Sequence, residues 1–254
     1  MNIDLQTELP IAAALPPTHH EWLAQRPFTL VLTAGYFGFF AHTGMLSALL
    51  QAGLVPRRVI GVSGGSVTGG LWAAGVQIDV IAEMLHALDR RAFWDPGIPL
   101  GGLLRGDKLD AQLRRLLAVG GNERLERTPV PFTPVVFDPL GRRTVGLRWG
   151  DTATAIRASC AVPFLFRPVW IDRRPLLDGG LRDPLGQSVV EAGERLLIHD
   201  VTRNGATDEL ARDECLSFRI EDLTRAGAFR LSEGLEALEH ARLACDTWLK
   251  EPLG

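Results

Sequence analysis

The chain has 254 residues, of which 27 are Lys or Arg and 30 are Asp or Glu, so its formal net charge is −3. Hydrophobic residues make up 46% and charged residues 22%, a composition typical of a globular protein with a sizeable core. This balance excludes a disordered tail, a collagen-like fibre and a charge-rich coiled coil. It offers no electrostatic basis for binding nucleic acid, so we expect none.

The first 26 residues are predicted to form a loose N-terminal segment, in which Pro16 and Pro17 prevent an early helix. This segment lacks the basic and the long apolar regions of a Sec signal peptide. Residues 27–254 contain no internal repeat and no convincing linker. We therefore expect a single domain over residues 27–254.

The next part of the chain alternates strands, glycine turns and helices. Residues 28–32 and 58–62 have the apolar, β-favouring composition of buried strands, and residues 39–51 and 66–74 are predicted helices. This order favours two neighbouring parallel strands joined by a right-handed crossover. Both glycine turns then lie at the carboxyl ends of strands, where open α/β sheets usually hold their ligands.

The remainder continues the α/β pattern, with residues 96–106 predicted as a glycine-rich loop and Asp151 as a helix cap. The predicted helices are 79–88, 109–117, 151–159 and 231–249, and the predicted strands are 134–137, 144–149, 169–171, 176–177 and 195–198. The fold class is therefore α/β, with a central, mainly parallel sheet flanked by helices.

Two stretches without charged residues, 27–56 and 59–78, are long enough to cross a bilayer. Glycines and polar side chains interrupt both, so we favour buried strand–turn–helix units over transmembrane helices.

The chain has three cysteines, Cys160, Cys215 and Cys245. Their number is odd, and no two of them have the close spacing of a metal-binding CxxC pair. They predict reduced thiols and no metal site, and the chain is expected to be cytoplasmic.

Residues Gly61-Val62-Ser63-Gly64-Gly65 fit the pattern G-x-S-x-G between a predicted strand and a predicted helix. In this context the turn presents the serine hydroxyl, and the helix directs free N–H groups and a positive dipole end at it. The same residues are compatible with a phosphate-binding turn or with a merely tight connection.

Two further turns carry candidate chemistry. Asp178 lies in the segment Leu176-Leu177-Asp178-Gly179-Gly180. It is a candidate general base, because partial burial raises the basicity of a carboxylate. The alternative is that Asp178 only stabilises a turn or caps a helix. The turn Gly35-Tyr36-Phe37-Gly38 offers backbone N–H groups for an oxyanion hole. The alternative is that its glycines only allow the backbone dihedral angles that the connection from strand to helix requires. None of the histidines lies in a compelling local motif; they are His19, His20, His42, His86, His199 and His240.

Together, in this order, the three turns resemble the patatin-like phospholipase family. That family has a glycine-rich loop, then G-x-S-x-G, then D-G-[GA], and uses a Ser–Asp dyad without a catalytic histidine. The resemblance runs from about Phe28 to Gly186. It includes the segment 38–75 around the serine and the segment 156–184, which is similar to the family's A-S-x-A-x-P-x-x-F stretch before the aspartate.

The resemblance implies a patatin-like three-layer architecture and assigns a role to each motif. Ser63 is the nucleophile, Asp178 the base, and the N–H groups of Gly35, Tyr36 and Gly64 form the oxyanion hole. The glycines that support these turns are Gly38, Gly61, Gly65, Gly179 and Gly180. No metal or organic cofactor is implied.

The glycine loop departs from the family pattern. Where the family usually has G-G-G-x-[RK]-G, this chain has Thr33-Ala34-Gly35-Tyr36-Phe37-Gly38. Phe37 takes the place of the basic residue, and we expect it to contribute to an acyl-chain site. Phe39 and Phe40 are expected in the core instead.

The expected function is hydrolysis of an acyl ester in a lipid, most simply a phospholipid or lysophospholipid, with transient contact to a membrane surface allowed. Two alternatives stay open: a general esterase with a histidine-containing triad, and a lipid-binding or regulatory protein without turnover. The sequence leaves the head group, the acyl length and the oligomeric state open.

Overall fold

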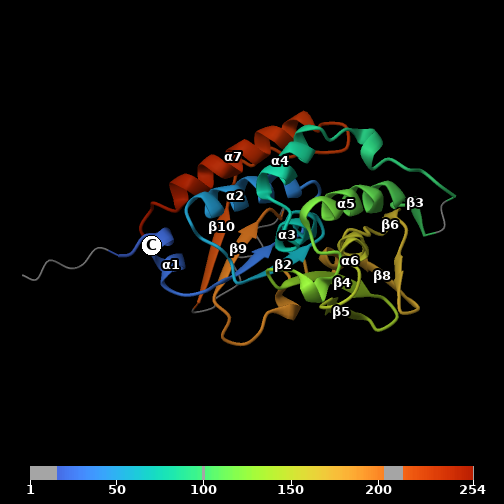
Figure 1. The fold of residues 1–254 in the computed structure, drawn as a ribbon, viewed down its shortest axis with the longest axis horizontal. Coiled ribbons are helices and arrows are strands. Elements are labelled where there is room, and N and C mark those ends of the chain that lie inside the picture. The colour runs from blue at the N-terminus through green and yellow to red at the C-terminus, as the bar shows by residue number, and fades with distance from the viewer. Residues whose placement is uncertain (1–15, 99–100, 203–213, 254) are drawn as a thin grey trace, which may run out of the picture.

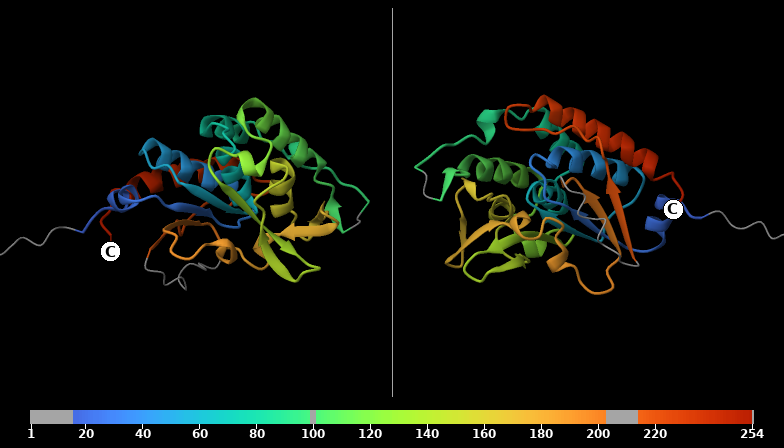
Figure 2. Two further views of the ribbon diagram at one scale, coloured as in Figure 1. Left: turned by 60° about the horizontal axis from the view of Figure 1, so that its bottom comes forward. Right: turned by 180° about the vertical axis from the view of Figure 1, so that it is seen from behind.

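The computed structural model describes residues 16–98, 101–202 and 214–253. Within these ranges the chain forms a central eight-stranded sheet and a separate two-stranded one, with helices gathered largely on one face of the central sheet (Figures 1 and 2). The predicted α/β class, with a central, mainly parallel sheet flanked by helices, is confirmed.

The strands of the central sheet follow the order β10-β9-β1-β2-β4-β8-β7, and β5 also pairs with β4. The five strands from β10 to β4 are mutually parallel, whereas β5 and β8 run antiparallel to β4, and β7 antiparallel to β8. The bounds are β1 (Thr29–Leu32), β2 (Arg58–Val62), β4 (Phe132–Asp138), β5 (Arg143–Gly146), β7 (Val169–Ile171), β8 (Arg174–Asp178), β9 (Leu196–Asp200) and β10 (Cys215–Arg219). The two-stranded sheet pairs β3 (Gly102–Leu104) with β6 (Phe164–Phe166) in parallel.

The helices are α1 (His19–Gln25), α2 (Phe39–Gln51), α3 (Gly64–Ala73), α4 (Ile78–His86), α5 (Asp107–Gly120), α6 (Thr152–Ser159) and α7 (Ser232–Trp248), and the short 3-10 turns are η1 (Arg90–Ala92), η2 (Leu125–Arg127), η3 (Gly179–Leu181) and η4 (Gln187–Val189). Asp151 caps α6 as predicted, because its side chain accepts the Thr154 N–H. Among the described residues, no helix combines the length and the apolar character that crossing a bilayer would require.

The two faces of the sheet bury different side chains, as alternation along each strand requires. Leu30 and Leu32 of β1 belong to the larger core, together with residues of α2, α3, α5 and α6. Val31 points to the opposite side and packs with Ile60, where Val189 and Val190 cover the sheet. Each face is therefore closed by a different segment of the chain.

Four elements were not predicted from the sequence: α1, β3, β6 and β10. Helix α1 begins at a capping box of Thr18 and Glu21, and its first turn is bonded to the chain after α7 through His19 N–H and the Glu251 carbonyl. The part of the N-terminal segment that the structure describes is therefore ordered against the C-terminal helix. Residues 1–15 of the predicted loose segment lie outside the described residues.

Candidate active site

Ser63 occupies a strained turn between β2 and α3. Its φ of 53° and ψ of −119° lie in a region that residues with side chains rarely adopt. Such a conformation costs on the order of 1–3 kcal/mol and persists where the surroundings hold it in place. The turn places Ser63 at the N-terminus of α3, whose first amide groups have no acceptor within the helix.

Neighbours from α6 and β4 hold this turn. The Ser63 N–H donates to the hydroxyl of Ser159 at 3.0 Å, and Ser159 in turn donates to the Val135 carbonyl at 2.7 Å. Ser66 donates a further 2.8 Å bond to the same hydroxyl, and the Cys160 thiol donates to the Ser63 carbonyl at 3.1 Å. Burial, together with the nearby Asp178 charge, raises the pKa of Cys160, so it remains a protonated donor.

The glycine turn after β1 lies directly against the serine turn. Because β1 and β2 are parallel neighbours, with Leu32 opposite Gly61, their carboxyl ends meet at one edge of the sheet. A Cβ added to Gly64 would lie 2.6 Å from the Gly35 carbonyl oxygen, so the two turns touch through their backbones. Gly35 also closes its own turn by accepting the Gly38 N–H at 2.9 Å.

The supporting glycines sit where the chain is too crowded for a side chain. At each of them an added Cβ would lie between 2.1 and 2.9 Å from a neighbouring atom; they are Gly38, Gly61, Gly65, Gly179 and Gly180. The sequence-predicted glycines therefore permit close packing of the three turns. In contrast, Phe37 adopts a left-handed φ of 59° without being glycine, which adds strain to the loop.

Asp178 reaches Ser63 from the far side of β4. It ends β8, which pairs with β4 at Val136, and it is only 5% exposed. Its carboxylate accepts the Gly180 N–H at 2.7 Å and lies close enough to the Ser63 side chain for that hydroxyl to lower its pKa. Burial raises the pKa of Asp178 to about 6, against the opposing effects of the Ser63 side chain and the Gly180 N–H. A carboxylate with this pKa is a stronger base than an exposed aspartate and is still ionised at neutral pH.

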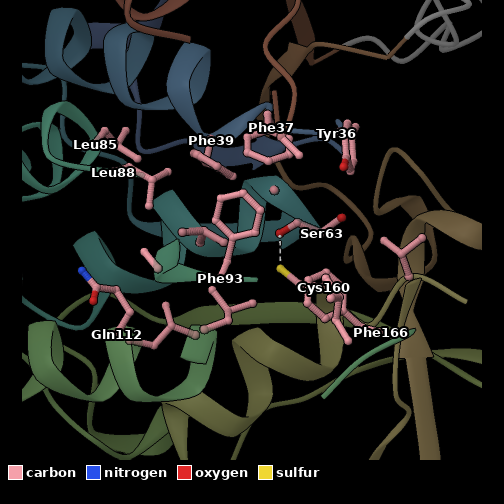
Figure 3. A pocket seen from close by; sticks show the side chains of 18 of the residues that line it. Tyr36, Phe37, Phe39, Ser63, Leu85, Leu88, Phe93, Gln112, Cys160 and Phe166 are labelled. Atoms are coloured by element: carbon pink, nitrogen blue, oxygen red, sulfur yellow. Dashed lines mark hydrogen bonds between the residues drawn. The ribbon is translucent and has the colours of Figure 1, made fainter. Parts of the chain in front are cut away.

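An apolar cavity opens beside Ser63 (Figure 3). The rings of Phe37, Phe39 and Phe93 lie on one side of the serine, and Phe166 lies near Cys160. Further lining comes from α4, the residues just after it and α5, mainly Met84, Leu85, Leu88, Leu109, Leu113 and Leu116. Phe40 is completely buried in the core as predicted. Phe39 is partly buried and packs against the core as expected, and from the first turn of α2 it also lines this cavity.

A second, more polar cavity meets the first at Ser63. Both cavities are lined by Gly35, Tyr36, Phe37 and Ser63. Only the second also contains Asp178, with Gly180, Thr202, Arg219 and Arg225 around it. The serine hydroxyl therefore stands between an apolar and a polar compartment.

No histidine lines either cavity in the described part of the chain. His42 and His199 are fully buried, and His86 and His240 are exposed on helices. Among the described residues, no group of three or more His, Cys, Asp or Glu side chains is arranged to hold a metal ion, and all three cysteines are free.

Sequence reasoning missed the residues that hold the serine turn from outside it. Ser159 is the last residue of α6 and Cys160 follows it, in a segment whose resemblance to the family gives no sign of a contact with Ser63. The packing of α6 against β4 and α3 brings these two residues next to Ser63. The one sequence feature that could have indicated this contact is the short run of small and polar residues at the end of α6.

Comparison with known proteins agrees with this geometry. The pattern described as patatin-like phospholipase matches residues 30–189. The uncharacterized NTE family protein Rv1063c of Mycobacterium tuberculosis is 34% identical over 199 residues, covering 77% of this chain and 54% of that protein. The neuropathy target esterase sws of Drosophila melanogaster is 25% identical over 199 residues, covering 74% of this chain and 14% of that protein.

The fold is also found among solved structures. The crystal structure of VipD from Legionella pneumophila aligns with a TM-score of 0.60 at 13% identity, covering 87% of this chain and 67% of VipD. The chain spans about half the length of the mycobacterial relative. From the matched residues, which include the glycine turn, the serine turn and Asp178, the chain belongs to the patatin-like phospholipase family.

Proposed function

We propose that the protein hydrolyses acyl esters of lipids with a Ser63–Asp178 dyad. The observation that carries the proposal is the buried Asp178 carboxylate, which lies beside the Ser63 side chain where an apolar cavity meets a polar one. A serine hydroxyl is a weak nucleophile until a base removes its proton. Asp178, which lines the polar cavity together with Ser63 and whose pKa burial raises to about 6, is the base that we propose.

In the first half-reaction, Ser63 Oγ attacks the ester carbonyl carbon while Asp178 takes the hydroxyl proton. The carbonyl oxygen becomes an oxyanion, for which the N–H groups of Gly35, Tyr36 and Gly64 are the proposed donors. The C–O bond to the alcohol then breaks, the alcohol leaves with the proton from Asp178, and the acyl group remains on Ser63.

In the second half-reaction, Asp178 removes a proton from a water molecule that attacks the acyl-enzyme. The tetrahedral intermediate uses the same oxyanion donors. When it collapses, Ser63 Oγ recovers the proton from Asp178 and the fatty acid leaves. No metal or organic cofactor enters either step.

The two compartments suggest how a lipid ester is oriented. The apolar cavity lined by Phe39, Phe93 and the leucines of α4 and α5 suits an acyl chain, and each buried CH₂ contributes about 0.8 kcal/mol. The polar cavity with Arg219 and Arg225 suits the alcohol side of the ester. The substrate we propose is therefore a phospholipid or lysophospholipid.

Exposed apolar side chains near the cavity support transient contact with a membrane surface. Tyr36 and Trp94 line the cavity and are exposed, while Leu103, Phe164 and Phe229 are exposed neighbours of lining residues. Large apolar groups gathered at a site entrance favour association with a lipid interface. Cosedimentation with vesicles should fall when Trp94 and Phe164 are changed to Ser, and it should stay unchanged when the exposed Val119 is changed to Ser.

The decisive experiment incubates the protein with a mixed lipid extract and identifies the products by mass spectrometry. We expect free fatty acids with the matching lysolipids or deacylated head groups, and none of these with Ser63→Ala. Lipid binding without products from the folded wild-type protein would favour the non-catalytic alternative. Product release that survives in Ser63→Ala would remove the serine from the mechanism.

A further inference from the structure

Two histidines meet beneath the glycine turn. His42 comes from α2 and His199 from β9; both are fully buried, and their Nδ1 atoms are 2.9 Å apart with nearly perpendicular rings. The other ring nitrogen of His42, Nε2, lies 3.0 Å from the carbonyl oxygen of Thr33. Thr33 is the first residue after β1 and leads into the turn that contains Gly35.

The hydrogen bonds determine the tautomers of both rings. A carbonyl oxygen only accepts, so His42 Nε2 carries the hydrogen and donates to Thr33. Burial lowers the pKa of His42 to about 4 and that of His199 well below its usual value, so both rings are neutral at pH 7. His42 Nδ1 is then an acceptor, and His199 Nδ1 must be the donor. In agreement, the buried His199 Nε2 has no hydrogen-bond partner within the described residues.

All three polar groups of Thr33 are held by these neighbouring elements. Its N–H donates to the His199 carbonyl at 3.4 Å, its carbonyl accepts from His42, and its hydroxyl accepts the Val201 N–H at 3.0 Å. Val201 also fills the space beside Gly35, because a Cβ added to Gly35 would lie 2.5 Å from its methyl group. The start of the loop is thus held by β9, by Val201 directly after it, by α2, and by Pro184, whose carbonyl accepts the Ala34 N–H at 2.8 Å.

We propose that His199 and His42 are positioning residues for this active site. His199 Nδ1–H donates to His42 Nδ1, and His42 Nε2–H donates to the Thr33 carbonyl. These two consecutive hydrogen bonds orient the glycine turn. The peptide plane after Thr33 sets the direction in which the turn leaves β1, and with it the direction of the Gly35 and Tyr36 N–H groups. Oxyanion donors act well only when they are aimed in advance, so a small rotation of this plane reduces stabilisation of the transition state. The inference rests on the proposed ester hydrolysis.

Amide substitutions separate the two hydrogen bonds of His42. The Gln side-chain amide nitrogen reaches the position of Nε2, so His42→Gln keeps the donor to Thr33, whereas the shorter His42→Asn places its amide near Nδ1 and loses that donor. For His199, the amide of His199→Asn replaces the Nδ1 donor, and His199→Leu removes it at similar volume. Each pair compares a variant that keeps one defined bond with a variant that does not.

The variants are assayed on a short soluble ester, with kcat and KM determined separately. His42→Asn and His199→Leu should lower kcat by about tenfold or more with KM within about twofold, while His42→Gln and His199→Asn recover most of kcat. Thermal midpoints of all four are measured in parallel. Equal kcat losses within each pair, or kcat losses that merely follow the thermal midpoints, would overturn the positioning role.

A measurement without turnover separates this inference from the proposed function. In the wild-type protein, ¹⁵N NMR of the imidazoles should show the hydrogen on Nε2 of His42 and on Nδ1 of His199. The amide resonances of Gly35 and Tyr36 should shift in His42→Asn and stay near their wild-type positions in His42→Gln. The reverse tautomers, or unshifted Gly35 and Tyr36 amide resonances in His42→Asn, would contradict the proposed pair of hydrogen bonds even if the protein hydrolysed no ester at all.

Discussion

The backbone N–H of Ser63 donates a 3.0 Å hydrogen bond to the side-chain oxygen of Ser159, 96 residues along the chain. Ser159 is fully buried and connects the serine turn to β4 through the Val135 carbonyl. The strained backbone of Ser63 is therefore held from a second element. The energy of the strain is offset by this contact and by the packing of the glycines around the turn.

Ser159→Ala should loosen the turn and weaken the fold. The change leaves the Ser63 N–H and the Val135 carbonyl without a buried partner, so we expect the free energy of unfolding to fall by about 1–3 kcal/mol and kcat to fall more than KM rises. Denaturant unfolding and steady-state kinetics measure both. Ser217→Ala, on an exposed position of β10, is the matched control and should change neither quantity. A Ser159→Ala protein with wild-type stability and kcat would show that the contact is dispensable.

Ser63→Ala and Asp178→Asn should each nearly abolish ester hydrolysis while the fold remains intact. Because the proposed dyad would act as a unit, the double variant should be little worse than either single one. Asp172→Asn, an exposed aspartate in the turn before β8, should keep full activity. Substantial turnover in Asp178→Asn would assign the base to another group.

The rate should depend on the ionisation of Asp178. In the proposed dyad only the carboxylate form of Asp178 can accept the Ser63 proton, so kcat/KM should rise with pH and reach half its plateau near pH 6, the pKa to which burial raises this group. A pH–rate profile on a soluble ester tests this. A midpoint close to 4 would contradict the raised pKa of Asp178, and a rate independent of pH between 4 and 7 would contradict its role as the base.

The same pKa predicts the stability of Asp178→Asn. Since the pKa is higher in the folded state than the usual 3.8, folding favours the protonated form, and wild-type stability is lost as pH rises from about 4 through about 6. The neutral Asn avoids this loss. The thermal midpoint of the variant relative to wild type should therefore grow between pH 4 and 6 and level off above. A constant difference across this range would contradict the raised pKa.

None of His42, His86, His199 and His240 is expected to be the base. His86→Gln and His240→Gln change exposed side chains and should leave kcat near wild type. The two buried histidines should show only the smaller effects of a misplaced loop. A loss of about 10³-fold or more at any one of the four, in a folded protein, would instead indicate a histidine-containing triad.

Phe37→Arg should shift the lipid preference towards anionic substrates. The ring of Phe37 lies among Tyr36, Phe39 and Phe93, with centroids 4.8–5.5 Å away, at the junction of the two cavities. An arginine there supplies a partner for an anionic head group, while a short soluble ester should still be hydrolysed. Relative rates on matched neutral and anionic lipids measure the shift.

Leu140→Arg is the charge-matched control for Phe37→Arg, because Leu140 is exposed in the turn between β4 and β5. It should leave the ratio of rates on neutral and anionic lipids unchanged. An unchanged ratio in Phe37→Arg as well, with the protein folded, would reduce Phe37 to a packing residue.

The sequence by itself predicted the elements whose signals are local. Helix α2 and strand β2 have the predicted bounds, because a continuous apolar run or a helical run ended by glycine and proline depends on neighbouring residues alone. The serine, aspartate and glycine turns were identified for the same reason: each needs small residues within a few positions of the functional side chain. Strands β3 and β6 were missed because their three-residue segments become strands only by pairing with each other.

Only the tertiary structure decided how these turns combine. The parallel register of β1 with both β2 and β9 brings Thr33 beside His199, and the return of β8 along β4 carries Asp178 to Ser63. The contacts His42–His199 and Ser63–Ser159 join residues 157 and 96 positions apart. Local sequence carries no signal for such pairs, because their proximity follows from the sheet order and from helix packing, which depend on the burial of the whole chain.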